Sequence, residues 1–115
     1  MILTARALDC PSIWHAHGAR ARQQGISEAF VDALRDNTPL PALPAAEQIV
    51  GTYVQELCTT HQTRPATFHA ALTQFGARGV TELTTLMGYY ALLAFNANAF
   101  EIDVPASGPE PNMPL

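Results

Sequence analysis

The stretch from Val80 to Asn98 constrains the fold more than any other part of this chain, because it predicts a helix that is apolar on nearly every side. Its apolar residues recur at helical spacing, and Glu82 is its only acidic side chain. A helix of this kind lies at the centre of its fold or in an interface. The longest uninterrupted run of apolar residues and glycine, Leu86 to Phe95, is far shorter than the roughly 20 residues that cross a bilayer, so we expect no membrane-spanning helix.

The N-terminal half also shows helical periodicity. Apolar residues from Leu3 to Ala21 fall on one helix face, and Pro11 is expected to kink that helix or to start a new segment. Gly25 ends this region. Ser27 is a good N-cap for a second helix, whose apolar stripe consists of Phe30, Val31 and Leu34.

Two further helices are predicted before the apolar one. Pro44 suits the first position of a third helix, and Pro65 suits the start of a short fourth helix. In the fourth helix we expect three apolar side chains to face inward: Phe68, Leu72 and Phe75. Gly76 and Gly79 are expected to bracket a turn. No useful β-type alternation is present, so the sequence predicts an all-α fold with about five helices.

The composition excludes several classes of protein. The net charge is −4 and all six basic residues are arginine, so no basic stripe exists for nucleic acid or a membrane surface. The two cysteines form neither a disulfide scaffold nor a zinc-type spacing, so we expect no metal or other cofactor and a reduced, cytoplasmic protein. Charged residues make up only 14%, so we expect another subunit to cover part of the surface. Residues 1–104 are interpreted as one helical domain and residues 105–115 as a proline-rich tail, either extended, disordered or lying on a neighbour.

Cys10 and His17 are seven residues apart, which places them with Trp14 on one face of a helix. A thiol facing an imidazole is the minimum for an activated nucleophile or a proton shuttle. The alternatives are structural: Cys10 as a small buried apolar residue, His17 as a core histidine and Trp14 as a core aromatic. Both sets of roles stay open from the sequence.

Three segments together resemble the carboxymuconolactone decarboxylase family, which includes the alkylhydroperoxidase D-like proteins. The segments are Ile2-Leu3-Thr4-Ala5-Arg6 running into Trp14-x-x-His17, then Phe75-Gly76-x-x-Gly79-Val80-x-Glu82-Leu83, then Gly88-Tyr89-Tyr90 followed by Asn98-Ala99-Phe100-Glu101. The resemblance covers residues 2 to 105 and implies an all-helical homo-oligomer, a trimer or hexamer. It also implies a short or N-terminally truncated member, because relatives carry a helical segment before this region.

The resemblance implies two chemistries, which differ in the residues they need. Thiol peroxidases of the group use a Cys-x-x-Cys-x-x-x-His helix; on this chain Cys10 takes the first cysteine position, Ile13 the second and His17 the histidine. The decarboxylases use the same region for acid/base work on a lactone acid.

Three functions therefore stay open. The first is acid/base chemistry by His17 on a small lactone or carboxylate, with Trp14, Tyr90 and Glu82 as candidate substrate-binding residues. The second is a single-cysteine peroxidase that uses Cys10. The third is a helical oligomer or binding module without catalysis. Glu82 has an alternative role as the i, i+4 partner of Arg78.

Overall fold

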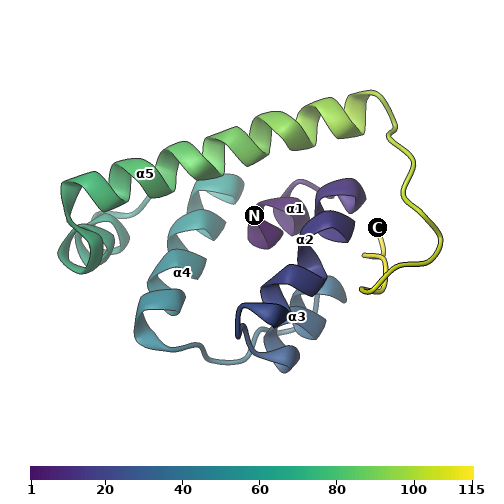
Figure 1. Ribbon diagram of the computed structural model, residues 1–115. Helices are drawn as coiled ribbons and strands as arrows, with labels where there is room; N and C mark the ends of the chain where they lie inside the picture. The colour runs from purple at the N-terminus through teal and green to yellow at the C-terminus, as the bar shows by residue number, and fades with distance from the viewer.

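A computed structural model describes all 115 residues and contains five α-helices and no strand, which confirms the all-α prediction. The helices are α1 (Ile2–Ala7), α2 (Pro11–Gln23), α3 (Glu28–Arg35), α4 (Ala45–Thr60) and α5 (Pro65–Ala99). The long part of α5 runs along one side of the molecule, with α4 and the pair α1 and α2 packed beneath it (Figure 1). None of the five helices combines the length and the apolar character that crossing a membrane requires.

The chain is interrupted between α1 and α2, at the position where Pro11 predicts a new segment. Asp9 has a φ of 46°, and Cys10 is the N-cap of a helix whose first residue is Pro11. Proline fits there because its missing N–H would have no partner in the first turn. The single amphipathic face expected from Leu3 to Ala21 is thus divided between two helices.

The next two helices begin close to their predicted starts. Ser27 caps α3, since its side-chain oxygen accepts a hydrogen bond from the backbone N–H of Phe30 at 3.4 Å. Pro44 is the N-cap of α4 rather than its first residue, and its carbonyl accepts from the N–H of Gln48 at 2.8 Å. The helix ends at His61, which adopts the left-handed conformation with a φ of 64°.

The fourth and fifth predicted helices are two arms of α5 joined at Gly76. Its φ of 71° and ψ of 173° are non-helical, a conformation that favours glycine. Gly79 is helical, but an added Cβ there would come within 2.7 Å of the Phe75 Cβ, so the kink uses both glycines for different reasons. The expectation that Phe68 and Leu72 face inward is wrong, because their exposed fractions are 44% and 36%. The buried residues of this arm are Thr67 and Ala71. These smaller side chains let the arm pack closely on α4, where the Thr67 hydroxyl donates to Glu56 Oε1 at 2.8 Å.

The tail after Pro105 is extended and folds back onto its own domain, at the open end of α1 and α2 (Figure 1). Arg22 donates through Nε and Nη2 to the two carboxylate oxygens of Glu110, at 2.7 and 2.8 Å. The side chain of Glu110 is only 1% exposed. It lies over Gly18, where an added Cβ would come within 2.6 Å of the Glu110 Cγ, so the close approach requires glycine.

Candidate functional site

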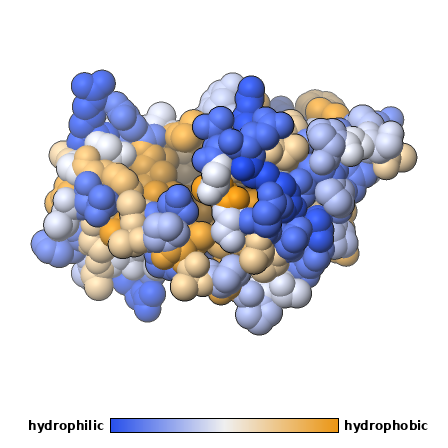
Figure 2. Space-filling model, turned by 60° about the horizontal axis from the view of Figure 1, so that its bottom comes forward, coloured by the Kyte–Doolittle hydropathy of each residue, from blue (hydrophilic) through white to orange (hydrophobic).

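A cavity of about 480 Å³ opens between α2 and α4, with the start of α1 at its base. Figure 2 shows a hollow with apolar walls on this face of the molecule. Its size falls in the range typical of small-molecule sites, which are mostly apolar with a few polar groups. The lining residues are Met1, Ile2, Leu3, His17, Arg20, Ala21, Gln24, Ile26, Phe30, Leu43, Glu47 and Val50.

His17 reaches this cavity from the second turn of α2. Its ring meets the ring of Tyr90 edge-on, with centroids 5.3 Å apart and planes at 84°. The Nδ1 atom is buried and has no hydrogen-bond partner in the protein. Burial lowers the pKa of the imidazole below its usual 6.5, and the positive charges of the terminal amino group and Arg20 lower it further. His17 is therefore a neutral imidazole near pH 7, and its Nδ1 atom is free to bind a ligand.

Arg20 lies one turn after His17 and lines the same cavity. It is the only arginine of the chain without a carboxylate partner. The other five all form ion pairs: Arg6, Arg22, Arg35, Arg64 and Arg78. Glu47 of α4 also lines the cavity but forms no ion pair with Arg20. A guanidinium without a carboxylate partner, beside an apolar cavity, is suited to bind a ligand that is apolar and carries a negative charge at one end.

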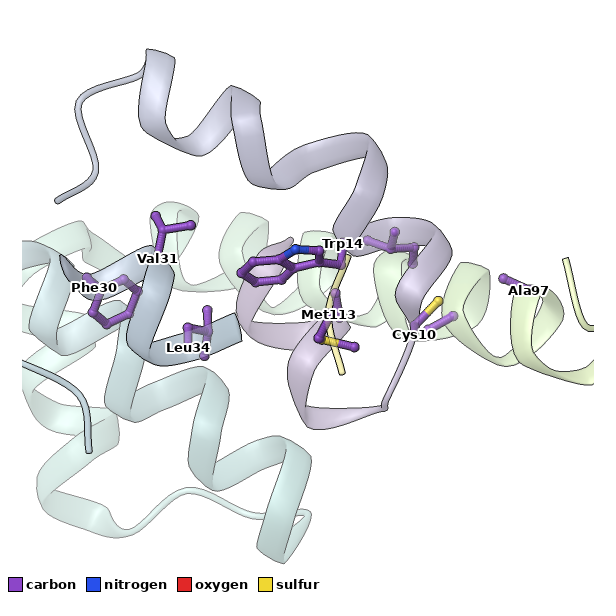
Figure 3. Packing of buried hydrophobic residues seen from close by; sticks show 10 residues of the cluster. Cys10, Trp14, Phe30, Val31, Leu34, Ala97 and Met113 are labelled. Atoms are coloured by element: carbon purple, nitrogen blue, oxygen red, sulfur yellow. The ribbon is translucent and has the colours of Figure 1, made fainter. Parts of the chain in front are cut away.

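Cys10 and Trp14 lie in the hydrophobic core and not in the wall of this cavity. Both side chains are completely buried, in a cluster that also contains Leu34, Ala97 and Met113. In Figure 3, Trp14 and Met113 occupy the middle of the view, with residues of α3 on one side and Cys10 toward Ala97 of α5 on the other. The structure therefore does not bring the Cys10 thiol and the His17 imidazole into one open site.

Hydrogen bonding supports the core position of Trp14. Its Nε1 donates to the carbonyl of Pro111 at 3.1 Å, so the extended tail satisfies the only polar atom of the indole. A fully buried cysteine is typically a structural, inert thiol rather than a reactive one.

Of the two remaining candidate residues, Tyr90 lies beside His17 and Glu82 lies elsewhere on α5. Tyr90 contacts His17 through its ring and is half-buried. Glu82 lies on the other part of α5, where its Oε1 accepts from Arg78 Nε at 2.8 Å and both side chains are mostly exposed. This is the i, i+4 ion pair that the sequence offered as the alternative role of Glu82.

Several residues of the site were missed by sequence reasoning. Arg20 follows His17 by three residues, a spacing that places both on one face, so this spacing was the available signal. Leu43 and Glu47 come from the linker and α4, and no local pattern connects them with α2. Nowhere do three His, Cys, Asp or Glu side chains gather in a way that could hold a metal ion.

No family model, curated protein or solved structure matches this chain. The resemblance to the carboxymuconolactone decarboxylase family stays a prediction that depends on the three quoted segments. What the chain can do is therefore argued from the cavity itself.

Proposed function

We propose that this cavity binds a small, largely apolar lactone or carboxylate, and that His17 is the acid/base group acting on it. One observation carries this proposal: His17 and Arg20 share one wall of an apolar cavity, the buried Nδ1 of His17 has no hydrogen-bond partner, and the exposed Arg20 forms no ion pair. An unpaired buried polar group typically costs about 1–3 kcal/mol, so a ligand that supplies a partner gains binding energy.

The roles of the two residues follow from their chemistry. Arg20 would hold the carboxylate or the polarised carbonyl oxygen at the rim, while the apolar walls take the hydrocarbon part. A ring nitrogen of neutral His17 would accept a proton from the carbon next to the carbonyl and return it, with the electron pair held as an enolate between the two transfers. A base with a pKa below 6.5 is mostly unprotonated at neutral pH and ready for this step.

The peroxidase alternative has less support from the site. Peroxide must reach a thiolate, and the Cys10 side chain is completely buried away from the cavity. Its place at the N-cap of α2 is the one feature in its favour.

Binding is tested by calorimetry with octanoate and with neutral octanamide. We expect octanoate to bind and Arg20→Gln to weaken that binding about 10-fold, the size of one charge-assisted hydrogen bond, with little change for octanamide. Arg78→Gln is the matched control, because Arg78 is exposed and remote from the cavity. Equal binding of octanoate by the parent chain and by Arg20→Gln would contradict the role of Arg20.

The chemistry is tested by NMR in deuterated buffer with γ-octalactone. We expect the protein to speed exchange of the hydrogens next to the carbonyl, and His17→Gln to remove that acceleration while the cavity still binds octanamide. His69→Gln is the control, since His69 is an exposed residue of α5. Unchanged exchange in His17→Gln would exclude His17 as the base.

A further inference from the structure

The side of α5 that faces away from the rest of the protein carries a regular row of uncharged residues. We call it the outer row, and it consists of Thr81, Thr85, Gly88, Leu92, Phe95 and Ala99. All six are exposed, with exposed fractions of 56% for Leu92 and 63% for Phe95. The tail leaves the end of α5 toward α1 and α2, so no element covers this side (Figure 1).

The spacing of the outer row is that of a helix that packs along a second helix. Successive members are separated by four, three, four, three and four residues, which is the 3.5-residue repeat of coiled-coil contacts. Val80, Ala94 and Ala97 meanwhile face the core, so one helix carries two apolar faces. This explains why the sequence of this helix is apolar on nearly every side.

The row is divided into a small half and a bulky half. Thr81, Thr85 and Gly88 make up the first half, and the second contains Leu92 and Phe95. A Cβ added at Gly88 would meet no atom within 4 Å, so open space lies above this residue. Such a surface is complementary to a copy of itself in the opposite direction, because bulky residues then face small ones.

We propose that two copies of this chain pair through the outer rows of α5, antiparallel and related by a two-fold axis. The two-fold axis crosses α5 at the level of residue 90 along the helix. In this register Leu92 of one copy lies over Gly88 of the other, and Phe95 lies over Thr85. A two-fold axis makes both halves of the contact identical, which is the commonest arrangement of soluble homo-oligomers. Parallel pairing would instead place Phe95 against Phe95.

Charge at the two ends of α5 favours the antiparallel direction. No charged residue lies between Leu83 and Phe100, while the ion pair of Arg78 and Glu82 precedes this stretch and the acidic Glu101 and Asp103 follow it. In the antiparallel register, Arg78 of one copy lies near Glu101 of the other. A parallel pair would bring Glu101 and Asp103 of one copy next to the same acidic residues of the other, which is unfavourable.

The exposed apolar area sets the strength of the contact. At about 200 Å² for a full side chain of their size, Tyr89, Leu92 and Phe95 together leave about 350 Å² uncovered on each copy. The small residues of the row add to this along a helix of about 35 Å. A standard interface buries about 800 Å² of each partner, so we expect a reversible dimer that forms at micromolar concentrations.

The association is tested by sedimentation velocity on the full chain. We expect a dimer, and we expect Leu92→Asp to raise its dissociation constant at least about 30-fold, as for a central interface residue. Gly88→Leu should do the same by filling the space above Gly88, without disturbing the monomer. Phe68→Asp is the control, because Phe68 is exposed on the other arm of α5. A monomer throughout the micromolar range, or a dimer that Leu92→Asp and Gly88→Leu leave intact, would overturn the proposal.

The direction of pairing is tested by disulfide trapping in a Cys58→Ser background, in which only the buried Cys10 remains. A mixture of Gly88→Cys and Leu92→Cys chains should yield the crosslinked mixed dimer. Each variant alone should yield little. Efficient crosslinking of Leu92→Cys with itself would mean parallel pairing and would overturn the antiparallel arrangement. Both tests read association and not ligand binding, so they are independent of the cavity.

Discussion

At the scale of single residues, His17 and Thr4 are the two residues with a buried side-chain polar atom that has no hydrogen-bond partner, and of these two only His17 lines the cavity. Trp14 Nε1 and the carboxylate of Glu110 both have partners, as buried polar groups normally do. The Nδ1 of His17 does not, although this atom is buried and the ring packs edge-on against Tyr90. Such an unpaired group lowers the stability of the free protein, which is typical of a position kept for binding or proton transfer.

The lowered pKa of His17 predicts how stability depends on pH. In the unfolded chain the imidazole has its usual pKa near 6.5, and in the folded protein the pKa is lower because burial disfavours the charged form. The unfolded state therefore binds more protons between these two values, so stability is complete above pH 6.5 and falls as the pH decreases through this window. Urea unfolding of the parent chain and of His17→Gln measures this, and the variant should lose less stability on acidification. An equal loss in both chains would mean that His17 does not carry the effect.

Ligand binding should shift the same group in the opposite direction. A bound octanoate places a negative charge in the cavity, which favours the imidazolium and raises the pKa of His17. NMR titration of the His17 ring with and without octanoate measures this shift, and neutral octanamide is the control. A shift of the same size with octanamide would mean that the charge of the ligand is not near His17.

At the scale of helices, the backbone conformation that kinks α5 is adopted by one residue, Gly76. Gly76 has positive φ with extended ψ, a region that is essentially restricted to glycine and costs other residues about 1–3 kcal/mol. We expect Gly76→Ala to lower the free energy of unfolding by this amount. Gly51→Ala is the control, because Gly51 lies within α4 with open space around an added Cβ, and there the change should stabilise by about 0.5–1 kcal/mol. Equal effects of the two substitutions in urea unfolding would contradict this explanation of the kink.

Most of the helices could be predicted from the sequence, because their signals are local. Ser27 caps α3, Pro11 opens α2, and the stripe of α3 is buried as its periodicity indicates. The burial of Phe68 and Leu72 was predicted wrongly because periodicity identifies an apolar face but not the element that covers it. For the same reason, the sequence did not connect His17 with the linker and α4 across the cavity. Only Arg20 could have been assigned to the same site as His17 from the sequence, because it follows His17 by three residues on the same helix.

At the scale of the whole molecule, ion pairs join the tail to α2 and α3. Arg22 of α2 pairs with Glu110 of the tail, Asp32 of α3 and Glu28 at the start of α3, and these carboxylates hold its pKa well above the usual range. Arg35 of α3 lies 3.9 Å from the same Glu110 carboxylate. This chain has few charged residues, and several of them thus form ion pairs at the tail. The tail is extended and has no helical hydrogen bonds of its own to hold it in place. No local pattern in the sequence of the tail indicates this, because its partners lie about 90 residues away in the sequence.

The anchoring of the tail can be tested with Glu110→Gln, which keeps the size of the side chain and removes its charge. The variant leaves Arg22 with exposed partners and the tail with weaker hydrogen bonds, so we expect a loss of about 1–3 kcal/mol in the free energy of unfolding. Because the Pro111 carbonyl accepts from Trp14, the single tryptophan should also become more accessible to acrylamide while the helical circular dichroism is unchanged. Glu82→Gln is the matched control: its ion pair with Arg78 is exposed and should be worth no more than about 0.5 kcal/mol. If both variants lost the same stability, or if Trp14 stayed protected in Glu110→Gln, the buried ion pair would not be what holds the tail against α2.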